Sequence, residues 1–140
     1  VLKKPSKRFS DLQSDKNFEA NILIVDAIGF LSKIYAYADL AYVGGAAGTT
    51  GLHNILEPAT FGVPIITGTH IEKFPEAQDL RTLAGLFTVT NAEETTALLQ
   101  KLTTDANFRL KTGIISGNFI SNNRGATPKI MAYIDQTLTA

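Results

Sequence analysis

Short apolar runs alternate along this chain with longer segments in which apolar side chains recur every three or four positions. The runs are rich in branched residues and predict buried strands. They cover residues 22–25, 40–43, 63–67 and 86–89, with a shorter strand at 7–10 and a polar loop at 11–20. The periodic segments predict helices over residues 29–38, 54–61, 74–83, 92–102, 108–119 and 127–138. Buried strands alternating with helices are typical of an α/β protein with a parallel, doubly wound sheet.

A glycine-rich loop at residues 44–51 follows the strand predicted at 40–43, and His53, Asn54 and Glu57 come directly after it. Glycine permits positive φ and lets a ligand approach the backbone closely. The start of the next helix offers unpaired N–H groups, which suit a phosphate. Asn54 and Glu57 are three positions apart, so a helix would place them on one face. An anion site beside an amide and a carboxylate predicts binding of a nucleotide or a sugar nucleotide.

Ligands of open parallel sheets bind where the carboxyl ends of the strands meet. The loops at the ends of three predicted strands are rich in glycine and small polar residues, so we expect them to converge on one crevice. The residues expected around this crevice are Asp26, Gly45, Gly48, Thr49, Thr50, His53, Asn54, Glu57, Thr67, His70 and Glu72.

Composition narrows the possible functions. The chain has 140 residues, 44% of them hydrophobic, which suits one compact domain. Its formal net charge is +0, which argues against a nucleic-acid binder because phosphate neutralisation needs clustered Lys and Arg. Cysteine is absent, which excludes disulfides and thiolate metal sites. The two histidines are far apart in the sequence, and we expect neither a metal nor a cofactor. The first residue is Val1 rather than Met, which suggests a fragment or a processed product.

Several segments resemble the bacterial 3-deoxy-D-manno-octulosonic acid (Kdo) transferases. The matching segments are residues 26–31 (DAIGFL), 37–45 (YADLAYVGG), 53–59 (HNILEPA), 62–64 (GVP) and 123–126 (NRGA), with Phe74 and Glu76. The resemblance runs from about Ile22 to about Ile134. The His-Asn-x-x-Glu-Pro element after a Gly-Gly strand end is its most specific part. Many members have Glu where Phe30 stands and Gly where Leu52 stands, and the family's upstream Pro-Arg-His element is absent.

The resemblance implies a Rossmann-like sheet that forms one half of a GT-B glycosyltransferase fold. Residues 1–140 would be the C-terminal, donor-binding domain, truncated at its N-terminal edge and without the N-terminal acceptor domain. The implied reaction moves Kdo from CMP-Kdo to a lipid A precursor in lipopolysaccharide biosynthesis. It would take place in the cytoplasm, with the full-length protein at the cytoplasmic face of the bacterial inner membrane. Membrane contact would be made only by parts that this chain lacks.

The resemblance also implies how the residues divide their roles. The catalytic base and the acceptor surface would belong to the missing domain, so no catalytic residue is assigned here and the chain alone is expected to be inactive. Substrate binding is assigned to Gly45, Gly48, Thr49, Thr50, Gly51, His53, Asn54, Glu57, Asp26 and Gly29.

Structural roles compete with these assignments at several positions. Glu57 can stabilise the dipole of its own helix, and Asp26 can cap the helix that follows it. His53 can cap a helix or pack under the loop. His70 is interpreted as a surface-loop histidine and Lys73 as a solvated lysine.

Two other functions stay open at this point. A GT-B transferase or epimerase that uses a UDP-sugar would share the Gly-Gly strand end and the Glu-Pro element. A non-catalytic α/β module that binds a nucleotide or a protein partner would share the fold but not the chemistry.

Overall fold

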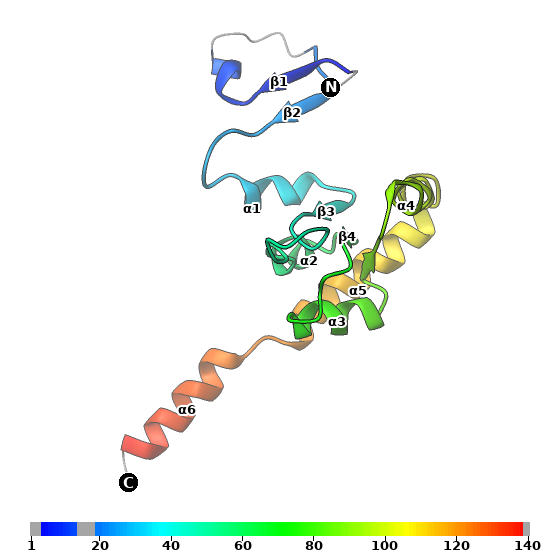
Figure 1. Ribbon diagram of the computed structural model, residues 1–140. Coiled ribbons are helices and arrows are strands. Elements are labelled where there is room, and N and C mark those ends of the chain that lie inside the picture. The colour runs from blue at the N-terminus through cyan, green and yellow to red at the C-terminus, as the bar shows by residue number, and fades with distance from the viewer. Residues whose placement is uncertain (1–3, 14–18, 139–140) are drawn as a thin grey trace. The chain divides into compact units, whose positions relative to one another are not determined.

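The computed structural model of the protein describes residues 4–13 and 19–138 (Figure 1). The chain forms two compact units, Val1–Ala36 and Tyr37–Ala140. The loop predicted at residues 11–20 lies partly outside the described residues, since 14–18 are not among them.

The first unit contains two short parallel strands. β1 (Ser6–Arg8) pairs with β2 (Ile22–Ile24) so that Ser6 lies opposite Ile22. A 3-10 helix follows β1 at Ser10–Gln13. The strand predicted at 22–25 is present, but its predicted burial is wrong, because Leu23 and Ile24 are each 41% exposed. Two strands of three residues form a sheet that is too small to bury both of its faces.

The helix predicted at residues 29–38 is shorter than expected. α1 spans Leu31–Ile34, and a 3-10 helix at Tyr35–Tyr37 follows it. Gly29 has φ +87°, which lies outside the right-handed helical region, so the helix cannot begin there.

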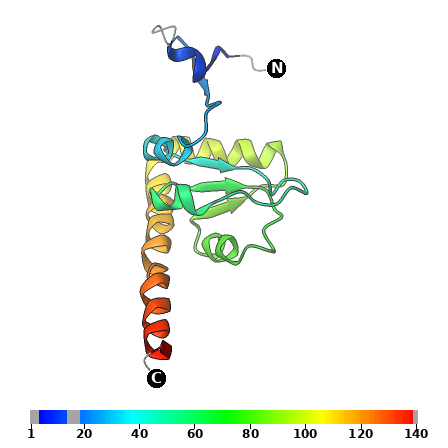
Figure 2. The ribbon, with the colours of Figure 1, turned by 90° about the vertical axis from the view of Figure 1, so that its left-hand side faces the viewer.

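The second unit is built on a parallel sheet in the order β3-β4-β5 (Figure 2). The strands are β3 (Ala41–Val43), β4 (Ile65–Thr67) and β5 (Leu86–Thr88). Ala41, Ile65 and Leu86 are in register across the three strands. β4 lies in the centre, and all of its residues are buried. Its continuous apolar run was therefore a correct sign of a strand covered on both faces.

Five helices follow the strands of this unit in the alternation that the sequence predicts. They are α2 (Leu56–Thr60), α3 (Pro75–Thr82), α4 (Ala92–Thr104), α5 (Ala106–Asn122) and α6 (Ala126–Leu138). Asn91 and Asp105 cap α4 and α5, because their side chains accept the N–H groups of Glu94 and Phe108. α3 packs on β5, while α5 packs on both α2 and α4.

Two glycines allow α2 and α5 to meet closely. Gly62 ends the α2 turn with φ +67°, a conformation that glycine adopts without strain. Gly113 in α5 lies against it, and a Cβ at Gly113 would overlap the Gly62 carbonyl. The backbones therefore touch where side chains would hold them apart.

In the part of the chain that the structure describes, the buried core lies in the second unit. Among the described residues, all those that are fully buried fall between Ala41 and Phe119. The largest cluster joins the sheet to α2, α3 and α5, and a smaller one around Ile66 and Leu102 joins it to α4. In contrast, every residue of α6 is exposed to solvent.

The α/β fold class is confirmed, with parallel strands distributed over two sheets. In the part of the chain that the structure describes, no helix is both long enough and apolar enough to cross a membrane.

Candidate functional site

A cavity of about 350 Å³ lies beyond the carboxyl ends of β3 and β4. We call it the strand-end cavity. Its lining residues are Gly48, Thr49, Gly51, His70, Glu72, Lys73 and Phe74. The predicted convergence of the loops after these two strands is therefore observed, and five residues assigned to the crevice or to substrate binding line it.

The glycine-rich loop, residues 44–51, is closed by hydrogen bonds within itself. The Gly48 N–H and the Thr50 hydroxyl both donate to the Gly45 carbonyl, at 3.3 and 3.4 Å. The His53 N–H donates to the Gly44 carbonyl at 3.2 Å, which closes the base of the loop. Gly45 has φ +97°, and a Cβ there would overlap the Gly51 carbonyl. Gly45 and Thr50 thus shape the loop without lining the cavity.

A second set of contacts holds this loop against the loop after β4. A Cβ at Gly68 would overlap Ala46 and Ala47, so the two backbones are in direct contact there. The His70 N–H donates to the Ala46 carbonyl at 3.0 Å, and the Nδ1 of the same residue lies 3.1 Å from that oxygen. Ala46 is completely buried. The cavity therefore has a floor in which both loops are fixed to each other.

Asn54 and Glu57 bond to each other instead of projecting separately from one helical face. The Asn54 Oδ1 accepts the Leu56 N–H at 2.9 Å, and its Nδ2 donates to the Glu57 Oε1 at 3.0 Å. The bond from the Leu56 N–H to the Asn54 Oδ1 closes a local turn, and such turns compete with helix formation. α2 therefore begins at Leu56 and not at the predicted residue 54. α2 has only five residues, and neither side chain lines the strand-end cavity. Glu57 is half-buried, with one carboxylate oxygen already paired.

The other predicted site residues fall in three places. His53 is exposed and lies against the glycine-rich loop, since a Cβ at Gly45 would come within 3.0 Å of its Cδ2. Thr67 is buried, and its hydroxyl donates to the Val43 carbonyl at 2.8 Å, so it links two strands and does not face the cavity. Asp26 and Gly29 belong to the first unit, and their place beside the loop stays a prediction.

Asp26 has a structural partner of its own. Its Oδ2 accepts the Ser10 hydroxyl at 2.7 Å, and its Oδ1 accepts the Ser10 N–H at 3.0 Å. The hydroxyl bond, followed by the N–H bond, lowers the pKa of Asp26 below its ordinary value. The alternative reading of Asp26 as the cap of α1 is wrong, because α1 has Phe30 in its N-cap position and no side-chain cap.

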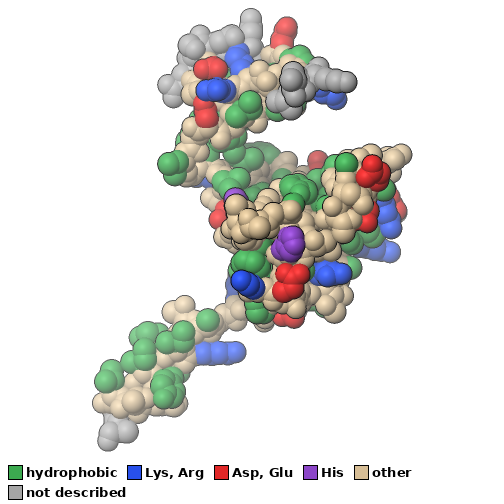
Figure 3. Space-filling model, in the orientation of Figure 1, with side chains coloured by type: hydrophobic (Ala, Val, Ile, Leu, Met, Phe, Trp, Pro, Cys, Tyr) green, Lys and Arg blue, Asp and Glu red, His purple; other side chains and the backbone are tan. Residues whose placement is uncertain are grey.

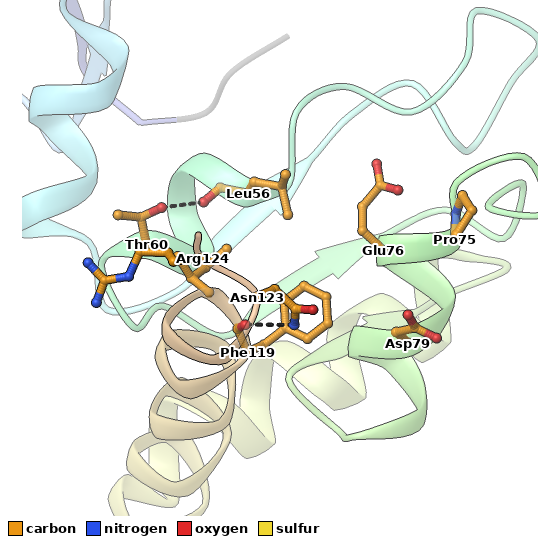
Figure 4. A pocket seen from close by; sticks show the side chains of 9 residues that line it. Leu56, Thr60, Pro75, Glu76, Asp79, Phe119, Asn123 and Arg124 are labelled. Atoms are coloured by element: carbon orange, nitrogen blue, oxygen red, sulfur yellow. Dashed lines mark hydrogen bonds between the residues drawn. The ribbon is translucent and has the colours of Figure 1, made fainter. Parts of the chain in front are cut away.

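A second cavity of about 490 Å³ lies between α2, α3 and the end of α5 (Figure 4). Its lining residues are Leu56, Thr60, Pro75, Glu76, Asp79, Phe119, Ile120, Asn123 and Arg124. Glu76, Asn123 and Arg124 belong to the segments that carry the family resemblance, and the structure brings them to one place. Exposed Asp79 and buried Phe119 were missed, because helical spacing alone does not show which side chains border a cavity.

The strand-end cavity offers both charge and hydrogen-bonding groups. Lys73 supplies a positive charge, Glu72 a negative one, Thr49 a hydroxyl and His70 an imidazole. Figure 3 shows acidic, basic and histidine side chains close together on one face of the molecule. Among the described residues, no group of three or more His, Cys, Asp or Glu side chains is placed to hold a metal ion. The lining suits a small polar ligand that carries hydroxyls and negative charge.

Parallel strands whose carboxyl ends carry a glycine-rich loop beside a cavity define a Rossmann-like domain, and this one matches one half of a GT-B fold. No protein-family model matches the chain. In fold it is similar to a crystal structure of the C-terminal CMP-Kdo binding domain of WaaA from Acinetobacter baumannii, with a TM-score of 0.73. The match covers 86% of this chain and 62% of that one, at 20% sequence identity.

Among the sequence relatives are several 3-deoxy-D-manno-octulosonic acid transferases. The chain is 30% identical over 135 residues to the Haemophilus influenzae protein, and this alignment covers 94% of this chain and 32% of that protein. It is 35% identical over 89 residues to the Aquifex aeolicus protein, and this alignment covers 63% of this chain and 24% of that protein. The chain thus spans about a third or less of these relatives. The resemblance to part of the Kdo transferases is confirmed.

Proposed function

We propose that this chain is the donor-binding domain of a glycosyltransferase that moves Kdo from CMP-Kdo to a lipid A precursor. The observation that supports this most directly is the strand-end cavity, which occupies the position at which open parallel sheets bind nucleotides. The kinship with Kdo transferases supports the choice of CMP-Kdo as the donor.

The cavity suggests how the donor is held. Backbone N–H groups of the glycine-rich loop and the Lys73 ammonium would receive the phosphate. The Asn54–Glu57 pair does not line the cavity, and on this proposal it would open to receive those ribose or sugar hydroxyls that extend beyond it. Positive groups near the phosphate would also stabilise the CMP that leaves, because negative charge develops on it in the transition state.

The rest of the reaction belongs to the remainder of a longer protein. The acceptor surface and the base that removes the proton of the acceptor hydroxyl are assigned to an N-terminal domain, with residues 1–140 as the C-terminal domain. On this proposal the donor site works in the cytoplasm, and the full-length protein at the cytoplasmic face of the inner membrane.

Calorimetry with CMP, UMP and ADP tests the choice of nucleotide. CMP is expected to bind more tightly than the other two, with a Kd near 1 mM, which corresponds to about −4 kcal/mol. Tighter binding of UMP would favour the UDP-sugar alternative, and no binding of any of the three would favour a non-catalytic module.

The variant Glu57→Gln tests the assigned role of the carboxylate. Gln keeps an oxygen that accepts the Asn54 amide hydrogen, so the fold is expected to survive. A charge-assisted hydrogen bond to a hydroxyl is worth roughly 1.5–3 kcal/mol, so CMP affinity should fall about ten- to a hundredfold. Unchanged affinity with a lower melting temperature would make Glu57 a structural residue.

A further inference from the structure

The ring of His70 is held by one of its two nitrogens. Nδ1 lies 3.1 Å from the Ala46 carbonyl oxygen. A carbonyl oxygen only accepts hydrogen bonds, so Nδ1 must carry the hydrogen. In a neutral imidazole this leaves Nε2 with a free lone pair, which makes it an acceptor.

The position of Nε2 follows from this arrangement. His70 lines the strand-end cavity between the two loops, and its exposed ring is anchored on the loop side through Nδ1. Among the described residues, no hydrogen-bond partner is found for Nε2. An acceptor of fixed direction therefore stands at the rim of a cavity whose other polar groups are Thr49, Glu72 and Lys73.

We infer that His70 is a donor-binding residue whose Nδ1 fixes the ring on the glycine-rich loop while its Nε2 accepts a hydrogen bond from a hydroxyl of the sugar nucleotide. This inference rests on the proposed function. It replaces the interpretation of His70 as an ordinary surface-loop histidine. It also gives the Ala46 contact a purpose, since that contact selects the tautomer that can receive a hydroxyl.

Two variants distinguish the role of Nδ1 from that of Nε2. In His70→Asn the side-chain amide can replace Nδ1 and keep the bond to Ala46, but nothing replaces Nε2. In His70→Ala both groups are lost. Affinities for CMP and for CMP-Kdo are measured for the wild type and both variants, with the melting temperature of each protein. CMP presents only the ribose hydroxyls, and CMP-Kdo adds those of the sugar.

His70→Asn is expected to melt with the wild type and to bind about three- to tenfold more weakly, the effect of one neutral hydrogen bond. A loss with both ligands assigns the bond to ribose, and a loss with CMP-Kdo alone assigns it to Kdo. Wild-type affinity of His70→Asn for both ligands would reduce His70 to an anchor of the loop and overturn the inference. If the wild type bound neither ligand, the proposed function would fail and the inference with it.

Nitrogen NMR of the ring gives an independent reading that does not depend on a variant. The hydrogen is expected on Nδ1, and added CMP or CMP-Kdo is expected to shift the Nε2 resonance more than the Nδ1 resonance. A hydrogen on Nε2 in the free protein would contradict the inference, because that nitrogen could then accept nothing.

Discussion

The glycines around the strand-end cavity differ in what they do, although the sequence presents them as one motif. Gly45 and Gly51 have positive φ, so their conformation favours glycine. Gly68 is needed because the loops touch there. Gly44 and Gly48 meet neither condition, since both have open space where a Cβ would stand and neither has positive φ. Only Gly48 of these last two lines the cavity.

Gly48→Ala and Gly44→Ala therefore form a matched pair. Both are expected to fold with a melting temperature close to that of the wild type, because each added methyl has room. Gly48→Ala should weaken CMP binding by at least about threefold. The methyl occupies space that the phosphate needs, so about one hydrogen bond between the loop and the phosphate would be lost. Gly44→Ala should bind as the wild type does. Equal affinities for the two variants in calorimetry would place the phosphate elsewhere.

The Ser10–Asp26 bond predicts a pH dependence in the first unit. The pKa of Asp26 is lowered in the folded protein, so the bond contributes stability above the ordinary carboxyl pKa, about pH 4, and loses it as the pH falls through the lowered value. In Ser10→Ala the pKa of Asp26 should return toward its ordinary value, while Ser10→Thr keeps both donors. Carbon NMR of the Asp26 carboxyl measures this, and identical titrations in all three proteins would contradict the assignment.

The sequence predicted several residues that line the strand-end cavity, but not the contacts that hold them. The glycine-rich loop, His70 and Glu72 were expected near one crevice because strand ends in a parallel sheet converge. The bond from His70 to Ala46 could not be read from the pattern, because it joins residues in two loops that only the folded sheet brings together. The Asn54–Glu57 bond was missed for a different reason, since helical spacing does not show that the Asn54 side chain forms a local turn just before the helix.

At the scale of elements, β3 and β4 are linked by a buried side chain as well as by their backbones. The Thr67 hydroxyl donates to the Val43 carbonyl at 2.8 Å in a fully buried position. Thr67→Val keeps the shape of the side chain and removes the hydroxyl donor, so the Val43 carbonyl loses a partner. The free energy of unfolding should therefore fall by about 1–3 kcal/mol. Thr67→Ser keeps the donor and loses only a methyl, which costs about 1 kcal/mol.

Urea unfolding of the three proteins measures this difference. The expected order of stability is wild type, then Thr67→Ser, then Thr67→Val. If Thr67→Val proved as stable as the wild type, the hydroxyl would contribute nothing to the joining of the two strands.

The pattern of apolar positions located the elements well and their ends less well. Strands at 40–43, 63–67 and 86–89 and helices at 92–102, 108–119 and 127–138 are all present within a few residues. The errors lie where local chemistry acts against the pattern, at Gly29 before α1 and at Asn54 before α2. The prediction that the strand at 22–25 is buried was wrong for another reason. Burial depends on the elements that cover a strand, and the sequence of the strand itself does not show them.

At the scale of the whole molecule, the core that the described residues form belongs to the second unit. Since every fully buried residue among the described ones falls between Ala41 and Phe119, a chain of residues 37–140 is expected to unfold cooperatively by itself. Its melting temperature should lie within about 5 °C of that of the whole chain, which corresponds to a difference of roughly 1 kcal/mol in the free energy of unfolding. A chain that ends before α5 loses buried Thr112, Ser116 and Phe119 and should not fold. Loss of cooperative unfolding in residues 37–140 would show that the first unit completes the core.

The last prediction is that the 140-residue chain binds the donor and transfers nothing. A transferase must place an acceptor hydroxyl beside the donor carbon and remove its proton. The strand-end cavity, at about 350 Å³, is near the lower limit for one small-molecule ligand, so the donor alone would fill it. Its carboxylate, Glu72, would then face the donor and not an acceptor. The chain is mixed with CMP-Kdo and a lipid A precursor, and CMP release is compared with release in buffer, with the Haemophilus influenzae relative as the active control. Release and transfer above the buffer rate would place the catalytic base within these residues.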